Sequence, residues 1–448
     1  MAIRRNLIIV LAHGLRSDAI GDSQTWPLQT PHLEKLIGRS LRLVATSACP
    51  ADSGGLVSLF TGLHARQHGY INQTASNITC EGWPTQLVDA GYHVAGVGCV
   101  SAIEPWLHTA VHVDDVERLD SSACSYLASS RARGTYQAIA QQRRQRQRYG
   151  PFEPDRLLLD AEDDIDGYIS KVARDTLSQM PYDKPWALIV AFNGPGNDLP
   201  PPTLYDQMVN IRALEEGFVP ADLTQIDDVA ELDFPRVMLQ RLEPHKLARI
   251  RCDYLGRVSL IDHAVGRLMQ TLENRKDRDR TWSIVTSDRG HLLGDRGLIG
   301  HRSFLGAAVE VPFILTPPTP AKLHASPGLV STVDVAGTIA ALAGCDLPAA
   351  AMGRSLLHVL AGEPLGMPRG GACISEFGRR LMLETEQYKA IFKVDTGEAI
   401  GLYDLLRDAD ERHNIVRTVT GLNVLDSLRL RLANALMAMR SLPGGGCD

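Results

Sequence analysis

Short, continuous runs of apolar residues alternate along the chain with segments whose apolar residues recur at helical spacing. Five apolar runs predict buried β-strands over residues 6–12, 93–98, 186–192, 283–287 and 311–315. Helical spacing predicts helices over residues 31–38, 84–91, 166–177 and 247–273. Strands that are apolar throughout and separated by helices are typical of a mostly parallel sheet covered on both faces. We therefore expect an α/β fold.

The pattern changes after residue 362, where short predicted strands and a turn lead to a final helix near residues 424–440. This change indicates a main α/β domain over residues 1–365 and a small C-terminal α+β subdomain over residues 366–448. The arginine-rich segment 141–149 predicts a solvated helical arm, with anion or partner binding as the alternative.

Polar residues and glycines follow three of the predicted strands, at residues 12–14, 193–195 and 287–289. The carboxyl ends of parallel strands meet at one edge of a sheet, and the functional site of such a fold lies just beyond that edge. These three segments are therefore the first places to look for chemistry.

Composition excludes several classes of protein. The chain has 448 residues, of which 44% are hydrophobic and 22% charged, as in an ordinary globular protein. A formal net charge of −6 gives no electrostatic basis for binding nucleic acid or an anionic membrane, and no apolar run has the length of a membrane-spanning helix. The eight cysteines are scattered, and the apolar segment after the N-terminal arginines is too short for a signal peptide. We expect a cytoplasmic protein with reduced thiols.

A series of landmarks runs along nearly the whole chain, including NLIIVLAHGLRSD, SLFTGLHARQHG, AFNGPGNDLPPP, TSDRGHLLGDRGLIGHRSF and GLYDLLRDADERHN. In this order they resemble the sulfatase family of the alkaline phosphatase superfamily, in its arylsulfatase and phosphonate monoester hydrolase branches. The resemblance implies an alkaline-phosphatase-like sandwich, with a central, mostly parallel mixed sheet between helices and a small C-terminal α+β subdomain. It also implies hydrolysis of sulfate or phosphate esters by a formylglycine nucleophile, made from Cys or Ser in a C-x-P-S-R motif, and a divalent cation held by carboxylates.

The position of the family's nucleophile holds Asp52, from which formylglycine cannot form, and Gly54, Gly55 and Leu56 stand where Pro, Ser and Arg are expected. Asp52 and Ser53 are interpreted as N-caps of the helix that follows. The alternative is a nucleophilic Ser53, because Asp-Ser is the nucleophile dipeptide of alkaline phosphatases. Gly54 and Gly55 would let an oxyanion approach the amides of the helix closely.

The metal positions implied by the resemblance are also changed. His13 stands where an acidic ligand is expected, and Arg289 replaces the ligand that should follow Asp288. A guanidinium can pair with a carboxylate and replace a cation electrostatically, so we predict an ion pair from Arg289 to Asp52 or Asp288. The alternative is a one-His, two-carboxylate site, made by His13, Asp52 and Asp288, for one divalent metal (Ca, Mn or Zn).

Cationic substrate positions implied by the resemblance are replaced as well. The expected Gly-Lys-Trp-His segment reads Gly-Cys-Val-Ser, with Cys99 and Ser101 in place of the Lys and the His. The His expected three residues after Asn193 is Gly196, and the Lys of a later loop is His301. His301 could keep a leaving-group or anion-binding function. Cys99, Ser101, Asn193 and Arg289 are the candidate substrate-binding side chains.

These replacements predict a sulfatase-like pseudoenzyme without a cofactor. It would act as an anion-binding module for a small sulfated or phosphorylated ligand, or as a subunit of a homo-oligomer or of an assembly with another protein. The alternative is a reworked metal-dependent sulfate or phosphate ester hydrolase that uses Ser53 or a water activated by Asp52. Asp18, His291 and Asp295 are interpreted as scaffold or rim residues.

Overall fold

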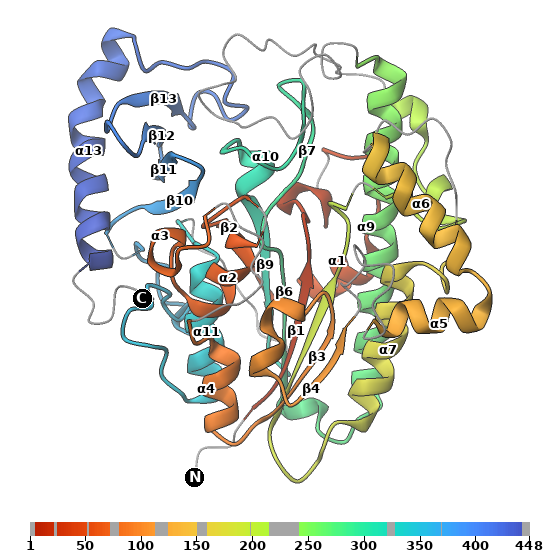
Figure 1. Ribbon diagram of the computed structural model, residues 1–448. Coiled ribbons are helices and arrows are strands. Elements are labelled where there is room, and N and C mark those ends of the chain that lie inside the picture. Colours follow the sequence, from red (N-terminus) through yellow and green to blue (C-terminus); the bar gives the residue numbers. More distant parts are fainter. Residues whose placement is uncertain are drawn as a thin grey trace.

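A central sheet between two layers of helices, with a second and smaller sheet beside it, forms the body of the molecule (Figure 1). The computed structural model describes residues 5–21, 25–51, 53–71, 80–112, 124–149, 159–197, 199–214, 242–319, 328–368 and 370–440. Of the helices in these ranges, none has the length and apolar character needed to cross a membrane.

Within the described residues the central sheet has seven strands, in the order β2-β9-β6-β1-β5-β3-β4. The strands are β1 (Asn6–Ala12), β2 (Leu41–Thr46), β3 (His93–Gly98), β4 (Thr109–His112), β5 (Trp186–Phe192), β6 (Thr281–Thr286) and β9 (Glu310–Thr316). Strand β9 runs antiparallel to both of its neighbours, and the other pairs are parallel. The predicted α/β fold with a mostly parallel mixed sheet is confirmed.

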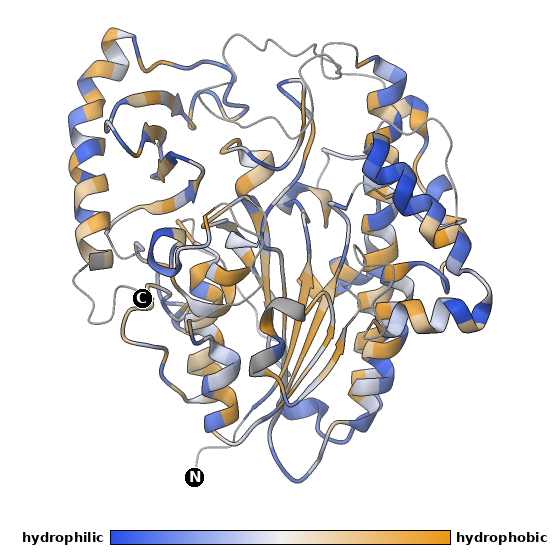
Figure 2. Cartoon of the chain, in the orientation of Figure 1, coloured by the Kyte–Doolittle hydropathy of each residue, from blue (hydrophilic) through white to orange (hydrophobic). Residues whose placement is uncertain are grey.

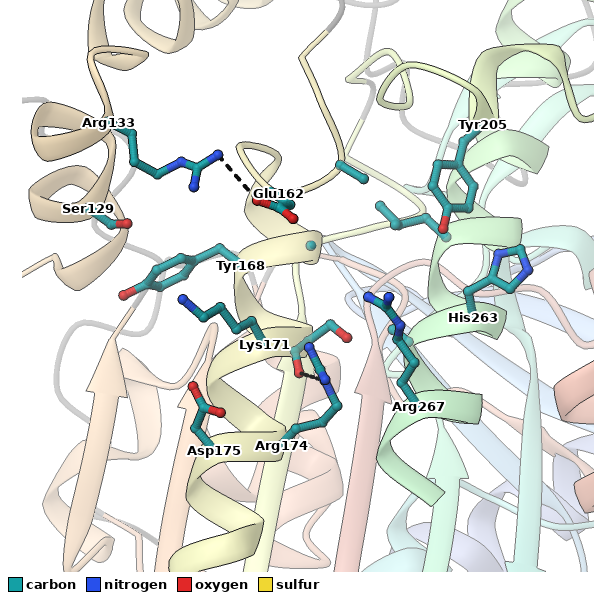
Figure 3. Close-up of a pocket in the computed structure, with 15 residues that line it drawn as sticks. Ser129, Arg133, Glu162, Tyr168, Lys171, Arg174, Asp175, Tyr205, His263 and Arg267 are labelled. Carbon is teal, nitrogen blue, oxygen red and sulfur yellow. Dashed lines mark hydrogen bonds and ion pairs between the residues drawn. The ribbon is translucent and has the colours of Figure 1, made fainter. Parts of the chain in front are cut away.

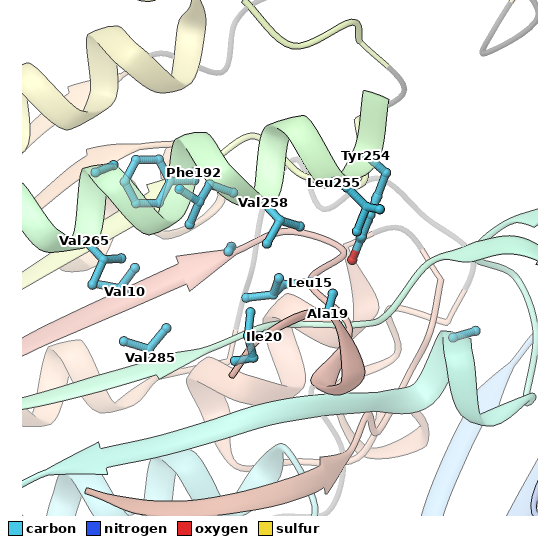
Figure 4. Close-up of a cluster of buried hydrophobic side chains, with 14 of the residues drawn as sticks. Val10, Leu15, Ala19, Ile20, Phe192, Tyr254, Leu255, Val258, Val265 and Val285 are labelled. Carbon is cyan, nitrogen blue, oxygen red and sulfur yellow. The ribbon is translucent and has the colours of Figure 1, made fainter. Parts of the chain in front are cut away.

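Each face of the sheet packs against its own set of helices. One face carries α1 (Pro31–Ile37), α7 (Ile165–Gln179) and α9 (Pro244–Glu273), and the other carries α2 (Gly54–Thr61), α4 (Trp83–Asp89) and α11 (Val333–Ala343). Successive side chains of a strand point to opposite faces, so Val10 joins the first core and Ile9 the second. Figure 4 shows Val10 beneath Val258 and Val265 of α9. This two-sided burial explains why β1 is apolar throughout.

The C-terminal part forms a four-stranded antiparallel sheet of β10 (Cys373–Phe377), β11 (Arg380–Glu384), β12 (Tyr388–Lys393) and β13 (Ala399–Asp404). The final helix, α13 (Val419–Arg440), packs against it through a separate apolar cluster that includes Leu425, Leu428 and Leu402. The predicted subdomain is therefore present, and its helix begins earlier than the apolar spacing indicated. The domain boundary at residue 365 stays a prediction.

Shorter elements complete the described fold. They are α3 (Ala65–His68), α5 (Ser125–Arg133), α6 (Tyr136–Tyr149), α10 (Gly306–Val309), α12 (Leu357–Leu360), the hairpin of β7 (Leu292–Asp295) and β8 (Leu298–Gly300), and the 3-10 helices η1 (Ser17–Ala19), η2 (Ser101–Trp106), η5 (Tyr205–Gln207), η6 (Ile211–Leu214) and η7 (Arg278–Arg280).

Two expectations need correction. The arginine-rich segment is helical, as α6, and strongly hydrophilic (Figure 2), but Gln142 and Arg143 are buried rather than solvated. The arginine stem covers apolar surface, and its guanidinium lies 5.9 Å from the ring of Tyr126. Six cysteines of the described part are free thiols, whereas Cys80 is disulfide-bonded. Sequence spacing alone does not report which cysteines meet in space.

Candidate functional site

The carboxyl ends of β1, β5 and β6 lie side by side, because these strands are neighbours in the sheet and run parallel. The register pairs Ala12 with Phe192, and the backbone N–H of His13 donates to the Phe192 carbonyl at 3.5 Å. The loops that follow the three strands carry His13, Asn193 and Asp288. The edge predicted from the sequence therefore collects all three segments.

His13, Asp288 and Arg289 form the centre of this edge. One carboxylate oxygen of Asp288, Oδ2, lies 3.2 Å from Nδ1 of His13 and also accepts a hydrogen bond from Nη1 of Arg289. The side chain of Asp288 is 2% exposed, against 16% for His13 and 14% for Arg289. The predicted ion pair between Arg289 and Asp288 is present, and the other predicted partner, Asp52, lies outside the described residues.

Opposing effects set the pKa of Asp288. Burial raises this pKa, because a carboxylate is poorly solvated inside the protein. The charges of Arg289 and His13, and the backbone N–H of Gly14 at 3.4 Å from Oδ1, lower it by more, so the pKa lies well below its usual range. Asp288 is therefore ionised near neutral pH, and side chains of the protein itself balance its charge.

Two serine hydroxyls hold the backbone around Asp288. Ser47, which follows β2, donates from Oγ to the Asp288 carbonyl at 2.5 Å. Ser287 donates from Oγ to the carbonyl of Ala12 at 2.6 Å and accepts from the N–H of Leu15 at 3.1 Å. These contacts connect the ends of β1, β2 and β6 and thereby fix the position of the backbone that carries the Asp288 carboxylate.

Ser53 occupies the position before α2, but it does not cap that helix. Its backbone is already helical (φ −78°, ψ −11°), and its side chain makes no capping hydrogen bond. A capping side chain reaches the first amides of a helix from an extended backbone, so the predicted N-cap role is wrong for Ser53. Asp52, the other predicted cap and the candidate catalytic residue, lies outside the described residues. A nucleophilic role for Ser53 stays a prediction.

Gly54 and Gly55 bring the first turn of α2 against other backbone. A Cβ on Gly55 would lie 2.5 Å from the carbonyl oxygen of Cys49 and 2.8 Å from that of Asp288. A Cβ on Gly54 would lie 2.5 Å from the carbonyl oxygen of Tyr70. Close packing of α2 against Cys49 and Asp288 explains Gly55, and packing against Tyr70 and Cys49 explains Gly54. Their predicted anion-binding role stays a prediction.

A second group of predicted residues lies where β3 and β5 end. Nδ2 of Asn193 is 3.5 Å from Sγ of Cys99, and Oδ1 of Asn193 accepts from Nδ2 of Asn197 at 2.7 Å. Cys99 is a half-buried free thiol. Ser101 begins η2, and its side chain lies outside the described part. His301 is half-buried after β8. The structure joins Asn193 to Cys99, and the binding or leaving-group roles of these residues stay predictions.

The loops after β1 and β5 touch through two glycines. Gly14 has a φ of +77°, and a Cβ on it would lie 2.7 Å from the Cα of Gly196. A Cβ on Gly196 would in turn lie 2.9 Å from the Cα of Gly14, and the N–H of Gly196 donates to the carbonyl of His13 at 2.9 Å. A histidine at position 196, as the resemblance would have it, does not fit while the two loops lie this close.

A buried ion-pair cluster beneath the Asn193 loop was missed by the sequence reasoning. Arg257 of α9 is fully buried and lies 2.9 Å from Asp166 and 2.8 Å from Asp164. Asp166 accepts from the N–H of Asn193 at 2.7 Å, and Arg257 donates to the carbonyl of Leu199 at 3.0 Å. The cluster therefore positions the loop after β5. Its sequence signal was an arginine within the apolar face of the long helix.

Arg16 ties the loop after β1 to the β7–β8 hairpin. Its guanidinium lies 2.8 Å from both Asp18 and Asp295, and Nη1 donates to the carbonyl of His291 at 3.2 Å. The ring of His291 stacks on that of Tyr254 with centroids 5.8 Å apart. These contacts agree with the interpretation of Asp18, His291 and Asp295 as scaffold residues.

The described side chains alone do not form a complete site for the divalent cation that the resemblance implies, and the third predicted ligand, Asp52, lies outside the described residues, so the His13, Asp52 and Asp288 site stays a prediction. In the part of the chain that the structure describes, no group of three or more His, Cys, Asp or Glu side chains is placed to hold a metal ion. His13 and Asp288 supply two donor atoms, and the guanidinium of Arg289 contacts the same oxygen of Asp288. A fixed positive charge there opposes a second cation.

Two protein-family models match the chain. The model described as Sulfatase matches residues 5–345, and the one described as N-sulphoglucosamine sulphohydrolase, C-terminal, matches residues 294–438. The uncharacterized sulfatase YidJ of Escherichia coli K12 is 23% identical over 452 residues, which cover 92% of this chain and 83% of that protein.

Solved structures share the whole fold. The phosphonate monoester hydrolase SpPMH from Silicibacter pomeroyi superimposes with a TM-score of 0.75 and 20% identity, covering 96% of each chain. The protein BT4656, solved in complex with its substrate D-glucosamine-2-N,6-O-disulfate, gives a TM-score of 0.71 and 18% identity over 99% of this chain and 100% of its own. From the match over residues 5–345 and this common architecture, the chain belongs to the sulfatase family, which has the alkaline-phosphatase-like fold.

Proposed function

We propose that this sulfatase-family protein does not carry out formylglycine- and metal-dependent ester hydrolysis, and that it acts as a binding module for a small sulfated or phosphorylated ligand. The observation that carries the proposal is the contact between the guanidinium of Arg289 and Oδ2 of Asp288. Asp288 stands at a position where the family resemblance implies a metal ligand, and its charge is here balanced by an arginine.

The replacement changes what the edge can do chemically. A divalent metal both neutralises the oxygens of a sulfate or phosphate ester and lowers the pKa of a bound water. An arginine can do the first, because its guanidinium stays protonated and binds oxyanions through paired N–H groups. It cannot do the second, because it offers a bound water no Lewis acid. Ligand binding is thus compatible with Arg289, whereas metal-assisted turnover is not.

Arg289 keeps hydrogen-bonding capacity for a ligand. A guanidinium has five N–H donors, and Nη1 is committed to Asp288. Its Nε is buried and has no hydrogen-bond partner among the described residues. The Arg289 side chain as a whole is 14% exposed, so an oxyanion that contacts it would bind the other N–H groups of the guanidinium. A sulfated ligand is the first choice, because the similar protein BT4656 was solved with a disulfated glucosamine.

Metal content is the decisive test of the catalytic half of the proposal. We expect no stoichiometric divalent metal by elemental mass spectrometry after growth in metal-supplemented medium without chelators. We also expect no turnover of p-nitrophenyl sulfate, p-nitrophenyl phosphate or a phosphonate monoester. About one metal per chain, lost in Asp288→Ala, would overturn the proposal. Arg289→Asn is the informative companion, because it removes the guanidinium and supplies a neutral oxygen donor.

A ligand titration tests the second part of the proposal, that the protein binds a small sulfated or phosphorylated ligand. Titration with inorganic sulfate and with D-glucosamine-2-N,6-O-disulfate should raise the thermal midpoint of the wild-type protein, and Arg289→Gln should abolish the shift. Turnover that disappears in Ser53→Ala would instead support the reworked hydrolase. No shift with either ligand in the wild type would contradict the binding module.

A further inference from the structure

A groove lined by basic side chains lies on the side of α7 and α9 that faces away from the central sheet. It consists of two adjoining cavities of ≈ 440 Å³ and ≈ 830 Å³, which share Arg133, Ala161, Glu162, Tyr205, His263 and Arg267 in their walls. We call it the helix groove. Its walls contain none of the strand-end residues His13, Asn193, Asp288 and Arg289, as far as the described chain extends.

The helix groove and the central sheet lie on opposite sides of α7, as the burial of the α7 side chains indicates. Ile169 and Ala173 are on the side of α7 that faces the sheet, and both are buried in the apolar core. Lys171 of the same helix is exposed, and Arg267 of α9 is exposed across from it. Figure 3 shows the Arg174 and Arg267 side chains rising from the two facing helices toward one cavity. The groove therefore opens to solvent between α7 and α9.

The walls of the two cavities together hold four cations, Arg133, Lys171, Arg174 and Arg267, and three carboxylates, Asp160, Glu162 and Asp175, which is a formal excess of one positive charge. The smaller cavity is lined by Arg133, Lys171, Arg174 and Arg267, with only Glu162 and Asp175 as acidic residues. Arg133 is already paired with Asp163 at 2.6 Å and with Glu162 at 3.4 Å.

Three of the four cations in the groove have no acidic partner among the described residues. Lys171, Arg174 and Arg267 make no ion pair with any residue that the structure describes. Arg174 has one hydrogen bond, from Nε to the carbonyl of Ser170 at 3.3 Å. The chain as a whole carries a formal net charge of −6, whereas the four cations and three carboxylates of the groove walls sum to +1. Such a concave positive surface raises the local concentration of anions.

Aromatic rings and hydroxyl groups stand among these cations. Tyr205 and His263 meet edge to face with ring centroids 5.5 Å apart, and Tyr168 lies across the cavity from them (Figure 3). A tyrosine presents an apolar face together with a hydroxyl group. Cations, half-buried tyrosines and the Ser129 hydroxyl together match a ligand that has anionic groups, hydroxyls and apolar ring faces. The combined space exceeds what a single inorganic anion fills.

We propose that the helix groove binds an acidic oligosaccharide, with Lys171, Arg174 and Arg267 pairing with its sulfate or carboxylate groups and Tyr205 packing against a sugar ring. This site goes beyond the proposed function, because it uses none of the strand-end residues. A saccharide held here would be bound without any group at the strand ends taking part.

Fluorescence anisotropy with a labelled, heparin-type sulfated hexasaccharide tests the proposal on the full chain. The double variant Lys171→Ala/Arg267→Ala should weaken binding by about tenfold or more and reduce its salt dependence, because two charge-assisted contacts are lost. Both side chains are exposed and without an ion pair among the described residues, so the variant should keep its thermal midpoint. The matched control is Arg429→Ala/Arg431→Ala on α13, which removes the same charge from another exposed surface.

Each outcome has a defined meaning. Binding that is lost in the groove variant and kept in the α13 control supports the site. A desulfated, carboxylated hexasaccharide that binds equally well assigns recognition to the carboxylates, and one that fails assigns it to the sulfates. No wild-type binding, equal loss in the control, or equally tight binding of inorganic polyphosphate would overturn the proposal. Loss in Arg289→Gln with retention in the groove variant would place the saccharide at the strand ends instead, which separates this inference from the proposed function.

Discussion

The guanidinium of Arg289 donates to the carboxylate of Asp288, its neighbour in sequence, although that carboxylate is 2% exposed. Adjacent residues of an extended segment normally point in opposite directions. Here both side chains meet because the strand β6 has already ended at Thr286 and the chain bends at Asp288, where the Ser47 and Ser287 hydroxyls hold the loop. The pair therefore depends on the loop geometry as much as on the two charges.

Removal of this arginine should be costly. Arg289→Ala leaves the buried Asp288 with His13 as its remaining ion-pair partner among the described side chains, so we expect a loss of about 2 to 4 kcal/mol in the free energy of unfolding. Urea denaturation at pH 7.5 measures the loss. Asp288→Asn/Arg289→Ala should be less destabilised than Arg289→Ala, because no carboxylate is then left unpaired. Additive effects of the two changes would contradict a coupling between these side chains.

The Arg257 cluster makes a stronger prediction. Arg257→Met keeps an unbranched apolar stem but removes the guanidinium and leaves two buried carboxylates, Asp164 and Asp166, without their counter-ion, so we expect a loss of about 3 to 5 kcal/mol. Denaturant unfolding reports this loss. The triple variant with Asp164→Asn and Asp166→Asn should recover part of it. A triple variant as unstable as Arg257→Met would show that packing, rather than uncompensated charge, sets the cost.

The sequence was most informative where one physical effect decides the structure. β1 and β5 are buried on both faces, so their apolar runs marked them correctly. β2 was not predicted, because its burial is interrupted at Arg42 and at the exposed Val44, as suits the edge of a sheet. Strand β4, at the other edge, was not predicted either, because it has only four residues, Thr109–His112, and pairs with β3 alone among the described strands.

In the candidate site, too, some features were predicted from the sequence and others were not. Strand ends, read from the apolar runs, located His13, Asp288 and Arg289 at one edge. The family resemblance then predicted the ion pair of Arg289 with Asp288, but not the contact of His13 with the same carboxylate. The failed cap at Ser53 depended on backbone dihedral angles, which residue type does not fix. The role of Arg257 depended on a partner about ninety residues away in sequence, and local patterns carry no such information. Long-range polar contacts were therefore the part that sequence reasoning could not reach.

The contact between the loops after β1 and β5 can be tested at Gly196. A methyl group there would lie 2.9 Å from the Cα of Gly14, so one of the loops must move. We expect Gly196→Ala to cost about 1 to 3 kcal/mol in the free energy of unfolding. The matched control is Gly38→Ala, where the backbone is helical and the nearest atom is 3.5 Å away, and this change should be neutral within about 0.5 kcal/mol. Equal effects at both positions would contradict the tight contact.

Acid should destabilise the protein partly through His68. This residue is buried, and its environment lowers its pKa to about 3, first through burial and then through the nearby His64. Its Nδ1 accepts from the N–H of Tyr70 at 3.1 Å, so the neutral ring carries its proton on Nε2 and donates it to Oγ of Ser58 at 2.9 Å. The contact with Tyr70 requires the neutral ring, because a protonated ring has no nitrogen that can accept a hydrogen bond.

The direction of the pH effect follows from the two pKa values of His68. The unfolded chain binds a proton at this ring below pH 6.5, whereas the folded chain does not until about pH 3, so stability is lost as the pH falls from 6.5. His68→Gln should lower stability at pH 7.5 by about 1 kcal/mol and reduce the slope between pH 6 and 4 by up to about 1.4 kcal/mol per pH unit. Urea denaturation at pH 7.5, 6.0, 5.0 and 4.0 measures both effects. The exposed His245, changed to Gln, should leave the slope as it is, and an unchanged slope in His68→Gln would exclude His68 as a source of the acid sensitivity.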